Sequence, residues 1–272
     1  MESFAIIGDI SLDKYTSIYN SQAKTTKAYN NQTFIDTLIS NSIKLNMPFS
    51  LLTVPLLDDI GNEYISKLEE HKARVFFPIN EICSPVSMNI CQKEKQVISI
   101  ASKNEIESIT PLFLKSIQGA FKNIKYIIVS TKLPFKTLSY IFEEYKDRRI
   151  IFYCDNESDY KRMHPYLTKA FLVLINIYNV KAMLNFTNRR PISRYIDALL
   201  KQKINATVLI GEGQDIYYGI DNNIYTIERK DKSKRKDNKN IYAKFTSGLL
   251  YNLINNGTIH EAINIATLNI NE

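Results

Sequence analysis

The stretch "IKYIIVSTKLPFKTLSYIFEEYKDRRIIFYCD", residues 124–155, places one longer amphipathic segment between two apolar runs. A run of about five apolar residues is typical of a strand that is buried on both faces, and the segment at 135–146 has the length and pattern of a helix. A strand followed by a helix and a second strand is the repeating unit of a parallel sheet. These residues therefore predict an α/β fold.

The same alternation continues in both directions along the chain. Strands and helices follow one another five or six times, which predicts a doubly wound sheet with helices on both faces. Two alternating runs around a polar turn at 87–102 predict a hairpin outside this sheet. The other predicted strands are 3–10, 49–57, 170–176 and 206–211, and the other predicted helices lie within 27–45, 58–71, 194–203 and 236–253.

Composition indicates a soluble globular protein. The 272 residues are 44% hydrophobic and 23% charged, which is ordinary for a chain that buries a sizeable core. No apolar run reaches the roughly 18 residues of a membrane span, and the start lacks the basic residues of a signal peptide. Three cysteines, Cys83, Cys91 and Cys154, are odd in number and not spaced as in zinc sites. We therefore expect a cytoplasmic protein without a structural metal.

The net charge of +7 is concentrated in one place. Residues 229–239, "RKDKSKRKDNK", hold seven basic and two acidic residues, so this basic loop alone contributes +5. Such a run is more often a solvated loop than a binding surface. It has no interleaved aromatic residues for stacking on bases, and no nucleic-acid-binding motif accompanies it. The sequence therefore argues against a nucleic-acid partner.

Glycine is scarce, with eight residues in the chain. That is about 3%, less than half of the usual share of roughly 7%. A protein that holds phosphate groups with backbone N–H groups normally has glycines at that position, because the backbone must approach the ligand closely. The chain therefore has few glycines that could form a phosphate-binding loop.

Polar residues follow several of the predicted strands. In an open α/β sheet, ligands bind outside the carboxyl ends of the strands. Each of these residues taken alone is accounted for as a loop or cap residue, but their joint placement at successive strand ends predicts a binding site. They are Gly8, Asp13, Asp58, Gly61, Asp155, Ser158, Lys161, Asn176 and Gly211.

The order and spacing of these residues resemble the ribokinase or phosphofructokinase-B superfamily, which phosphorylates sugars and nucleosides with ATP. "IGDISLD" (7–13) is similar to its opening strand motif, in which an aspartate five positions after a glycine grips sugar hydroxyls; here that aspartate is Asp13. "LLDDIGNEYISKL" (56–68) is similar to a segment with an aspartate and a glycine three positions later. The stretches at 92–116 and 152–167 look like the lid hairpin and a strand end of the pseudouridine kinase branch.

The resemblance spans essentially the whole chain. It implies one domain, 1–272, folded as a three-layer α/β/α sandwich with a small β-sheet lid contributed roughly by 11–28 and 84–103. It also implies a sugar or nucleoside ligand, ATP and Mg²⁺ as cofactors of an active enzyme, and a homodimer formed through the lid. On the substrate side the matching residues are Asp13, Asn31 and Lys161, and on the nucleotide and phosphate side they are Asn176, Gly211 and Gly248.

The resemblance departs from the family at "DNKNIYAKFTSG" (237–248), which aligns without a gap with the signature Asp-Thr-Thr-Gly-Ala-Gly-Asp-Ala-Phe-x-Ala-Gly. The position of the family's catalytic aspartate, which takes the proton from the acceptor hydroxyl, is Ala243. The Gly-Ala-Gly positions of its anion hole are Asn240, Ile241 and Tyr242. A general base contributes on the order of 10²- to 10⁴-fold to the rate, and an anion-hole donor roughly 10²- to 10³-fold.

Two further departures also concern phosphate handling. The glycine pair that precedes the family's first long helix corresponds to Thr26 and Lys27. The family motif Asn-x-x-Glu corresponds to residues 176–179, where Asn176 is kept and Asn179 stands in place of the glutamate.

Two hypotheses follow from the resemblance and these departures. The first is a catalytically impaired kinase homologue that acts by binding a sugar or nucleoside. The alternative is an active ATP-dependent sugar or nucleoside kinase with an unorthodox phosphate site, in which the basic loop supplies the positive charge.

Overall fold

A computed structural model describes most of the backbone of the chain. The side chains of the strands at 12–19, 22–25, 86–92 and 95–101, and those of residues 3, 59, 60, 105, 238, 239 and 269, are not part of this description. The described backbone comprises residues 3–10, 12–19, 22–25, 34–54, 59–79, 86–92, 95–101, 105–188, 190–211, 215–228 and 238–269.

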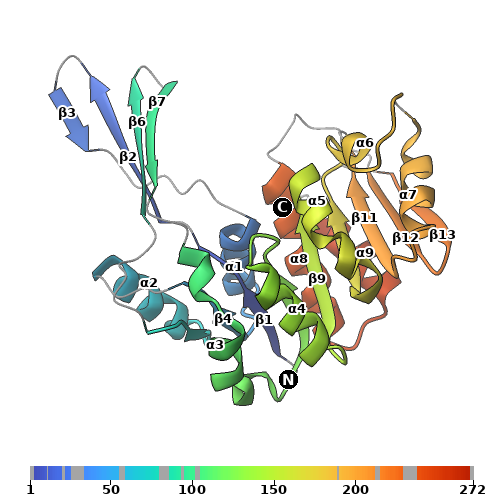
Figure 1. The fold of residues 1–272 in the computed structure, drawn as a ribbon, viewed down its shortest axis with the longest axis horizontal. Coiled ribbons are helices and arrows are strands. Elements are labelled where there is room, and N and C mark those ends of the chain that lie inside the picture. Colours follow the sequence, from blue (N-terminus) through green and yellow to red (C-terminus); the bar gives the residue numbers. More distant parts are fainter. Residues whose placement is uncertain are drawn as a thin grey trace.

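A nine-stranded sheet forms the centre of the molecule (Figure 1), in the order β13-β12-β11-β10-β9-β8-β1-β4-β5. Seven neighbouring strands, from β11 to β5, are parallel, and the hairpin of β12 and β13 extends the sheet in the antiparallel direction. The strands are β1 (Ser3–Ile7), β4 (Phe49–Leu52), β5 (Arg74–Phe76), β8 (Ile124–Val129), β9 (Arg149–Cys154), β10 (Leu172–Ile175), β11 (Ala206–Ile210), β12 (Ile216–Ile220) and β13 (Asn223–Ile227).

Helices cover both faces of this sheet, which confirms the predicted doubly wound α/β fold. One apolar core joins a face of the sheet to α1 (Phe34–Lys44), α2 (Asp59–Glu70), α8 (Asn238–Ile254) and α9 (Ile259–Asn269). A second core joins the other face to α3 (Pro111–Ser116), α4 (Phe135–Glu144), α5 (Glu157–Met163), α6 (Val180–Met183) and α7 (Ile192–Leu200). Short 3₁₀ helices lie at Glu105–Ser108, Gln118–Phe121 and His164–Lys169.

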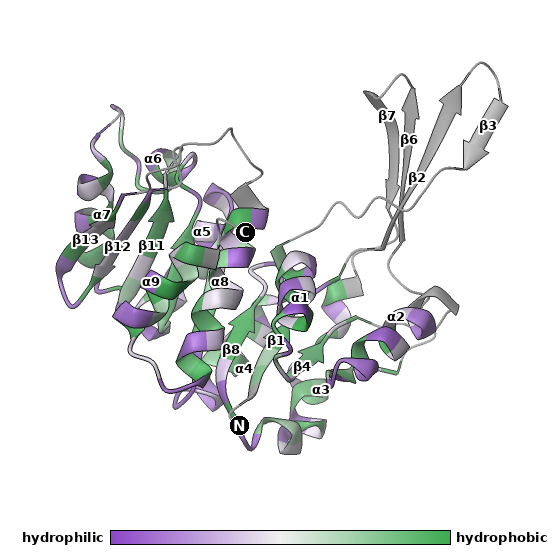
Figure 2. Ribbon diagram, turned by 180° about the vertical axis from the view of Figure 1, so that it is seen from behind, coloured by the Kyte–Doolittle hydropathy of each residue, from purple (hydrophilic) through white to green (hydrophobic). Residues whose placement is uncertain are grey.

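The central strands of the main sheet are apolar because both of their faces are buried. In β1, Phe4 and Ile6 belong to one core, whereas Ala5 and Ile7 belong to the other, and all four side chains are fully buried. Successive side chains of a strand point to opposite faces, so a two-sided sheet needs a continuous apolar run. Figure 2 shows this distribution, with hydrophobic strands inside and hydrophilic residues on the outer surfaces of the helices.

A second, four-stranded sheet has the order β3-β2-β6-β7, and Figure 1 draws it apart from the main sheet. It comprises β2 (Leu12–Tyr19), β3 (Gln22–Thr25), β6 (Val86–Gln92) and β7 (Lys95–Ala101). The antiparallel pair of β6 and β7 confirms the predicted hairpin. Within the described part of the chain, no helix combines the length and the apolar character that crossing a bilayer requires.

Candidate functional site

A cavity of about 170 Å³ lies at the carboxyl ends of β1, β8 and β9. From β1 the chain proceeds to β4 and β5 on one side, whereas β8 to β11 continue on the other side. The cavity therefore lies at the point where the strand order reverses, which is where open α/β sheets bind ligands. The described residues that line it are Asp9, Phe34, Ile35, Val129, Ser130, Thr131, Lys132, Tyr153, Asp155, Asn156 and Asp159.

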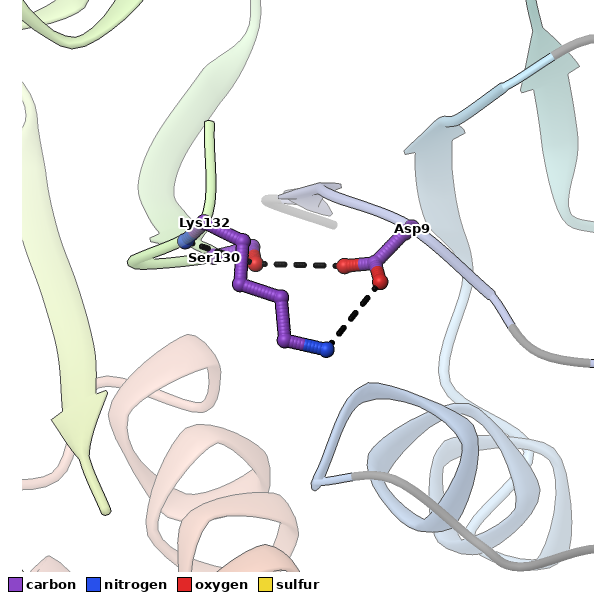
Figure 3. Close-up of polar contacts among 3 residues, drawn as sticks. All are labelled: Asp9, Ser130 and Lys132. Atoms are coloured by element: carbon purple, nitrogen blue, oxygen red, sulfur yellow. Dashed lines mark hydrogen bonds and ion pairs between the residues drawn. The ribbon is translucent and has the colours of Figure 1, made fainter. Parts of the chain in front are cut away.

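Asp9 connects the ends of β1 and β8 across the cavity (Figure 3). One of its carboxylate oxygens accepts the Ser130 hydroxyl at 3.3 Å, and the other lies 3.3 Å from the ammonium of Lys132. The close approach of the two strands depends on Gly8, because a Cβ at this position would lie 2.7 Å from the Cβ of Ser130. A glycine before Asp9 is therefore required for this arrangement.

Asp155, at the end of β9, is held by donors from two strands. Its Oδ1 atom accepts the Tyr153 hydroxyl at 2.9 Å and the side-chain amide of Asn176 at 2.9 Å. The Asn179 amide donates to the backbone carbonyl of Asp155 at 2.7 Å, and the backbone N–H of Asp155 donates to Asp159 at 3.1 Å. These contacts fix the carboxylate at the cavity wall.

Three aromatic rings extend from the cavity into the core. Phe34 of α1 stacks on Tyr153 of β9 with centroids 4.9 Å apart, and Tyr153 in turn lies 4.9 Å from the ring of Tyr242 in α8. Phe34 and Tyr153 line the cavity, whereas Tyr242 lies behind Tyr153 and is fully buried. The three rings connect the cavity wall to α8, the helix that contains residues 240–243.

Tyr242 bonds the ends of two neighbouring strands. Its hydroxyl donates to the carbonyl of Ile175, the last residue of β10, and accepts the N–H of Ile210, the last residue of β11, at 2.7 Å. Burial raises the pKa of this phenol above its ordinary value, so it remains neutral and able to donate. Buried backbone groups need a partner, and the tyrosine supplies one to each strand.

The residues next to Tyr242 in α8 are also part of the packed structure. Asn240 accepts the Thr37 hydroxyl of α1 at 2.7 Å, Ile241 belongs to the core, and Ala243 is completely buried. Because α8 begins at Asn238, Tyr242 and Ala243 lie beyond its first four residues. Backbone N–H groups there donate to carbonyls four residues earlier, so those of Tyr242 and Ala243 are not available to an anion.

The structure brings few of the predicted site residues together. Lys161 lies on the surface of α5, where its ammonium pairs with Glu157 at 2.5 Å, and it does not line the cavity. Asn176 lies behind Asp155, and its Oδ1 accepts the N–H of Tyr178 at 3.0 Å. Gly211 follows β11 and donates its N–H to the carbonyl of Asp215 at 2.7 Å.

The structure describes the remaining predicted site residues only in part. Gly248 is buried within α8. Asp13 lies in β2, where its backbone is in register with Ser87 of β6, and its side chain is not described. Asn31 lies outside the described residues, as does most of the basic loop 229–239. The predicted substrate group of Asp13, Asn31 and Lys161 therefore stays a prediction.

Only Asp155 of the described cavity residues is among the predicted site residues. The other ten are Asp9, Phe34, Ile35, Val129, Ser130, Thr131, Lys132, Tyr153, Asn156 and Asp159. Asp9, Ser130 and Lys132 lie within three residues of the end of a strand, so their position after the apolar runs is the sequence signal that points to them. In the sequence alone, Phe34 and Tyr153 are equally well explained as residues of the apolar core. Their role in the cavity wall becomes visible only when α1 lies beside β9.

Comparisons with known proteins establish the fold. No protein-family model matches the chain, and no curated protein matches it. Among solved structures, a carbohydrate kinase from Agrobacterium tumefaciens is 14% identical, with a TM-score of 0.77 over 99% of this chain and 90% of that chain. The ribokinase from Thermotoga maritima is 12% identical, with a TM-score of 0.75 over 98% of this chain and 91% of that chain.

A protein described as a ribokinase II from E. coli, in complex with ATP and Mg²⁺, is 10% identical, with a TM-score of 0.72 over 97% of this chain and 90% of that chain. At such identities the likeness concerns the arrangement of strands and helices, which agrees over nearly the full length of each chain. The chain has the ribokinase-like fold, a mixed α/β sheet between two layers of helices.

Proposed function

We propose that this chain is a homologue of carbohydrate and nucleoside kinases that has lost phosphoryl transfer and acts by binding a small sugar-like molecule in the cavity beside Asp9. The resemblance supplies the comparison, because it aligns residues 240–243 with the anion hole and the catalytic aspartate of that family. The observation that carries the proposal is the placement of Tyr242, whose buried hydroxyl bonds Ile175 and Ile210.

Loss of transfer follows from the chemistry that these residues retain. Ala243 has no group that accepts a proton, and its burial leaves no room for an acceptor hydroxyl beside it. The backbone N–H groups of Tyr242 and Ala243 belong to the interior of α8 rather than to a loop that faces a ligand. Both the base and the anion hole are therefore absent in this proposal, and each contributes separately to the rate.

ATP and Mg²⁺, the cofactors of the related kinases, do not fit these residues. The aromatic ring of Tyr242 occupies the place that the alignment assigns to a glycine beside a phosphate, and its hydroxyl is engaged by two strands. Mg²⁺ in kinase sites is held by one or two carboxylates together with the phosphates of the nucleotide, so it would not bind in this way without ATP. We derive no reaction step through either cofactor.

The size of the cavity supports a sugar rather than a nucleoside. Its volume of about 170 Å³ corresponds to roughly six water molecules at about 30 Å³ each. Pockets for drug-sized ligands measure roughly 300–1,000 Å³, so this cavity accommodates one small ring. The homodimer through the four-stranded sheet remains a separate part of the proposal, and sedimentation of the full chain measures it.

Calorimetric titration of the full chain tests the proposal. We expect D-ribose or a hexose to bind, ATP with Mg²⁺ to give no heat of binding, and a coupled assay for ADP release to show no turnover with either sugar or with pseudouridine. Sugar binding in the same preparation is the control that the protein is folded. Micromolar affinity for ATP, together with sugar-dependent ADP release, would show that the chain is an active kinase instead.

A further inference from the structure

We propose that the outer edge of β13 is an interaction surface, and that it pairs with β13 of a second copy of this chain in an antiparallel arrangement about a twofold axis. The inference does not depend on the proposed function, because it concerns neither the cavity nor its ligand. It also concerns a different surface from the four-stranded sheet, which lies on the opposite side of the molecule (Figure 1, Figure 2).

The edge of the main sheet at β13 is open. β13 is the last strand at one end of the sheet, and no strand of the described part of the chain pairs with its outer side. The other end of the sheet is β5, which has only three residues and begins with Arg74. Short strands and charged side chains protect a sheet edge against pairing. β13 has five residues, NIYTI, without a charge or a proline, so its edge lacks this protection.

The hairpin of β12 and β13 determines which backbone groups point outward. Ile220 pairs with Asn223 across the two-residue turn 221–222, and both turn residues have positive φ, of 50° and 62°. Such a hairpin closes on a hydrogen-bonded pair, and bonded pairs alternate with non-bonded pairs along the strands. The odd-numbered residues of β13 therefore bond β12, whereas the N–H and C=O groups of Ile224 and Thr226 point away from it.

An antiparallel pair centred on Tyr225 aligns the two copies of β13 over their full length. Ile224 of one copy then lies opposite Thr226 of the other, and these two residues exchange their outward N–H···O bonds. The twofold axis forms the same pair a second time. Tyr225 lies opposite its own counterpart in a non-hydrogen-bonded pair. The strand is therefore complementary to itself, as an isologous interface requires.

The charges at the two ends of β13 also favour an antiparallel pair. The turn before β13 contains Asp221, and the basic loop 229–239, with its net charge of +5, follows Glu228 at the other end. Antiparallel pairing brings the turn of one copy to the strand end from which the basic loop of the other begins, so that opposite charges approach each other. Glu228 then lies opposite the neutral side chain of Asn222. These charges and the self-complementary edge identify a second copy as the partner.

Sedimentation of the full chain over a range of micromolar concentrations tests the inference. We expect a species of twice the chain mass of 31.4 kDa. Thr226→Pro removes an outward N–H and no bond to β12, and proline is tolerated at an open edge. Ile224→Lys places a charge on the edge. Each variant should weaken association by about tenfold or more, because the change acts at two symmetric positions of the pair.

Ile265→Lys is the matched control for the charge variant. Ile265 lies on α9 and is 37% exposed, and Ile224 is 38% exposed. The control therefore adds the same charge at a similarly exposed apolar position, and it should leave association unchanged. Melting temperatures close to that of the parent show that the variants are folded.

Single cysteines test the register of the pair. Tyr225→Cys places a thiol opposite its own counterpart, where paired Cα atoms lie about 4.5 Å apart, within the range of a disulfide. Asn223→Cys is the control, because its counterpart would lie four positions along the strand, more than about 13 Å away. Mild oxidation should give a disulfide-linked dimer with Tyr225→Cys only. The parent, with its own three cysteines, is the blank.

The outcomes separate this edge from other surfaces. A parent that remains monomeric, or a dimer whose association neither β13 variant weakens, overturns the inference; in the second case another surface, such as the four-stranded sheet, forms the dimer. If both surfaces associate, the parent sediments as a larger species and the β13 variants reduce it to a dimer, which supports the inference. Equal cross-linking of both cysteine variants overturns the proposed register.

Discussion

The hydroxyl of Tyr242 accepts the backbone N–H of Ile210 at 2.7 Å, so a helix near the end of the chain is bonded to the last residue of a central strand. The same hydroxyl donates to Ile175 of the neighbouring strand. At the ends of β10 and β11, where the hydrogen bonds between strands end, the hydroxyl of Tyr242 therefore serves as the hydrogen-bond partner of these two backbone groups. Four predictions follow from this relationship and from the geometry of the cavity.

Replacing Tyr242 with phenylalanine should destabilise the protein by about 1–3 kcal/mol. The change keeps the ring but leaves the N–H of Ile210 and the carbonyl of Ile175 buried without this partner, and such groups incur a desolvation cost of that size. Urea unfolding measures the difference. Tyr251→Phe on the same helix is the control, because that ring is 43% exposed, and it should change stability by less than about 0.5 kcal/mol. Equal stability of both variants would contradict the role of the hydroxyl.

Introducing the family's aspartate at position 243 should not restore phosphoryl transfer. Ala243 is completely buried, and an unpaired carboxylate in such a place destabilises by about 3 kcal/mol or more. We expect Ala243→Asp to lower the melting temperature and to release no ADP from ATP in the presence of a sugar. Ala243→Ser, which is small and uncharged, should remain close to the parent in stability. Sugar-dependent release of ADP by a stable Ala243→Asp protein would disprove the proposal that this chain has lost phosphoryl transfer.

Replacing Gly8 with alanine should weaken both the fold and ligand binding. The added Cβ would lie 2.7 Å from the Cβ of Ser130 and would force β1 and β8 apart. Overpacking of this kind costs about 1–3 kcal/mol, and the displacement also separates Asp9 from Ser130 and Lys132.

Gly119→Ala is the matched control for this substitution, because a Cβ at Gly119 meets no atom within 4 Å. Unfolding experiments and sugar titration should distinguish the two alanine variants. If Gly8→Ala retains both the stability and the affinity of the parent, the close approach of the two strands is not required.

Stability should fall as the pH rises above about 10. Burial raises the pKa of Tyr160 from 10.0 to about 12, and burial also raises the pKa of Tyr242. Above pH 10 these phenols lose their protons in the unfolded chain but keep them in the folded protein, so the unfolded state binds fewer protons. The stabilisation is therefore complete below pH 10 and declines as the pH approaches the folded values.

Urea unfolding at several pH values between about 8 and 12 measures this decline. Tyr160→Phe should reduce the slope, because the substituted side chain no longer ionises in the unfolded state. A free energy of unfolding that stays constant across this window would show that the folded pKa values are not raised.

Local sequence patterns predicted six of the seven parallel strands, the helices α1, α2, α4, α7 and α8, and the β6–β7 hairpin, but not α9. The alternation of apolar and polar residues in these elements is set by the period of each element. The short strand β5 and the antiparallel hairpin β12–β13 were not predicted. Their pattern is weak: β13 is largely exposed, and β5 has only three residues. Their pairing depends on the edges of a sheet that exists only once the other strands have assembled.

The resemblance also predicted that residues 240–243 replace an aspartate and two glycines of the related kinases. This alignment stays a prediction. The sequence alone could not show which residues these side chains contact in the folded protein. Tyr242 bonds residues 67 and 32 positions away, and the cavity joins side chains from β1, β8, β9 and α1. Such contacts between distant residues arise from the order of the strands in the sheet and the packing of helices on it, so only the tertiary structure decided them.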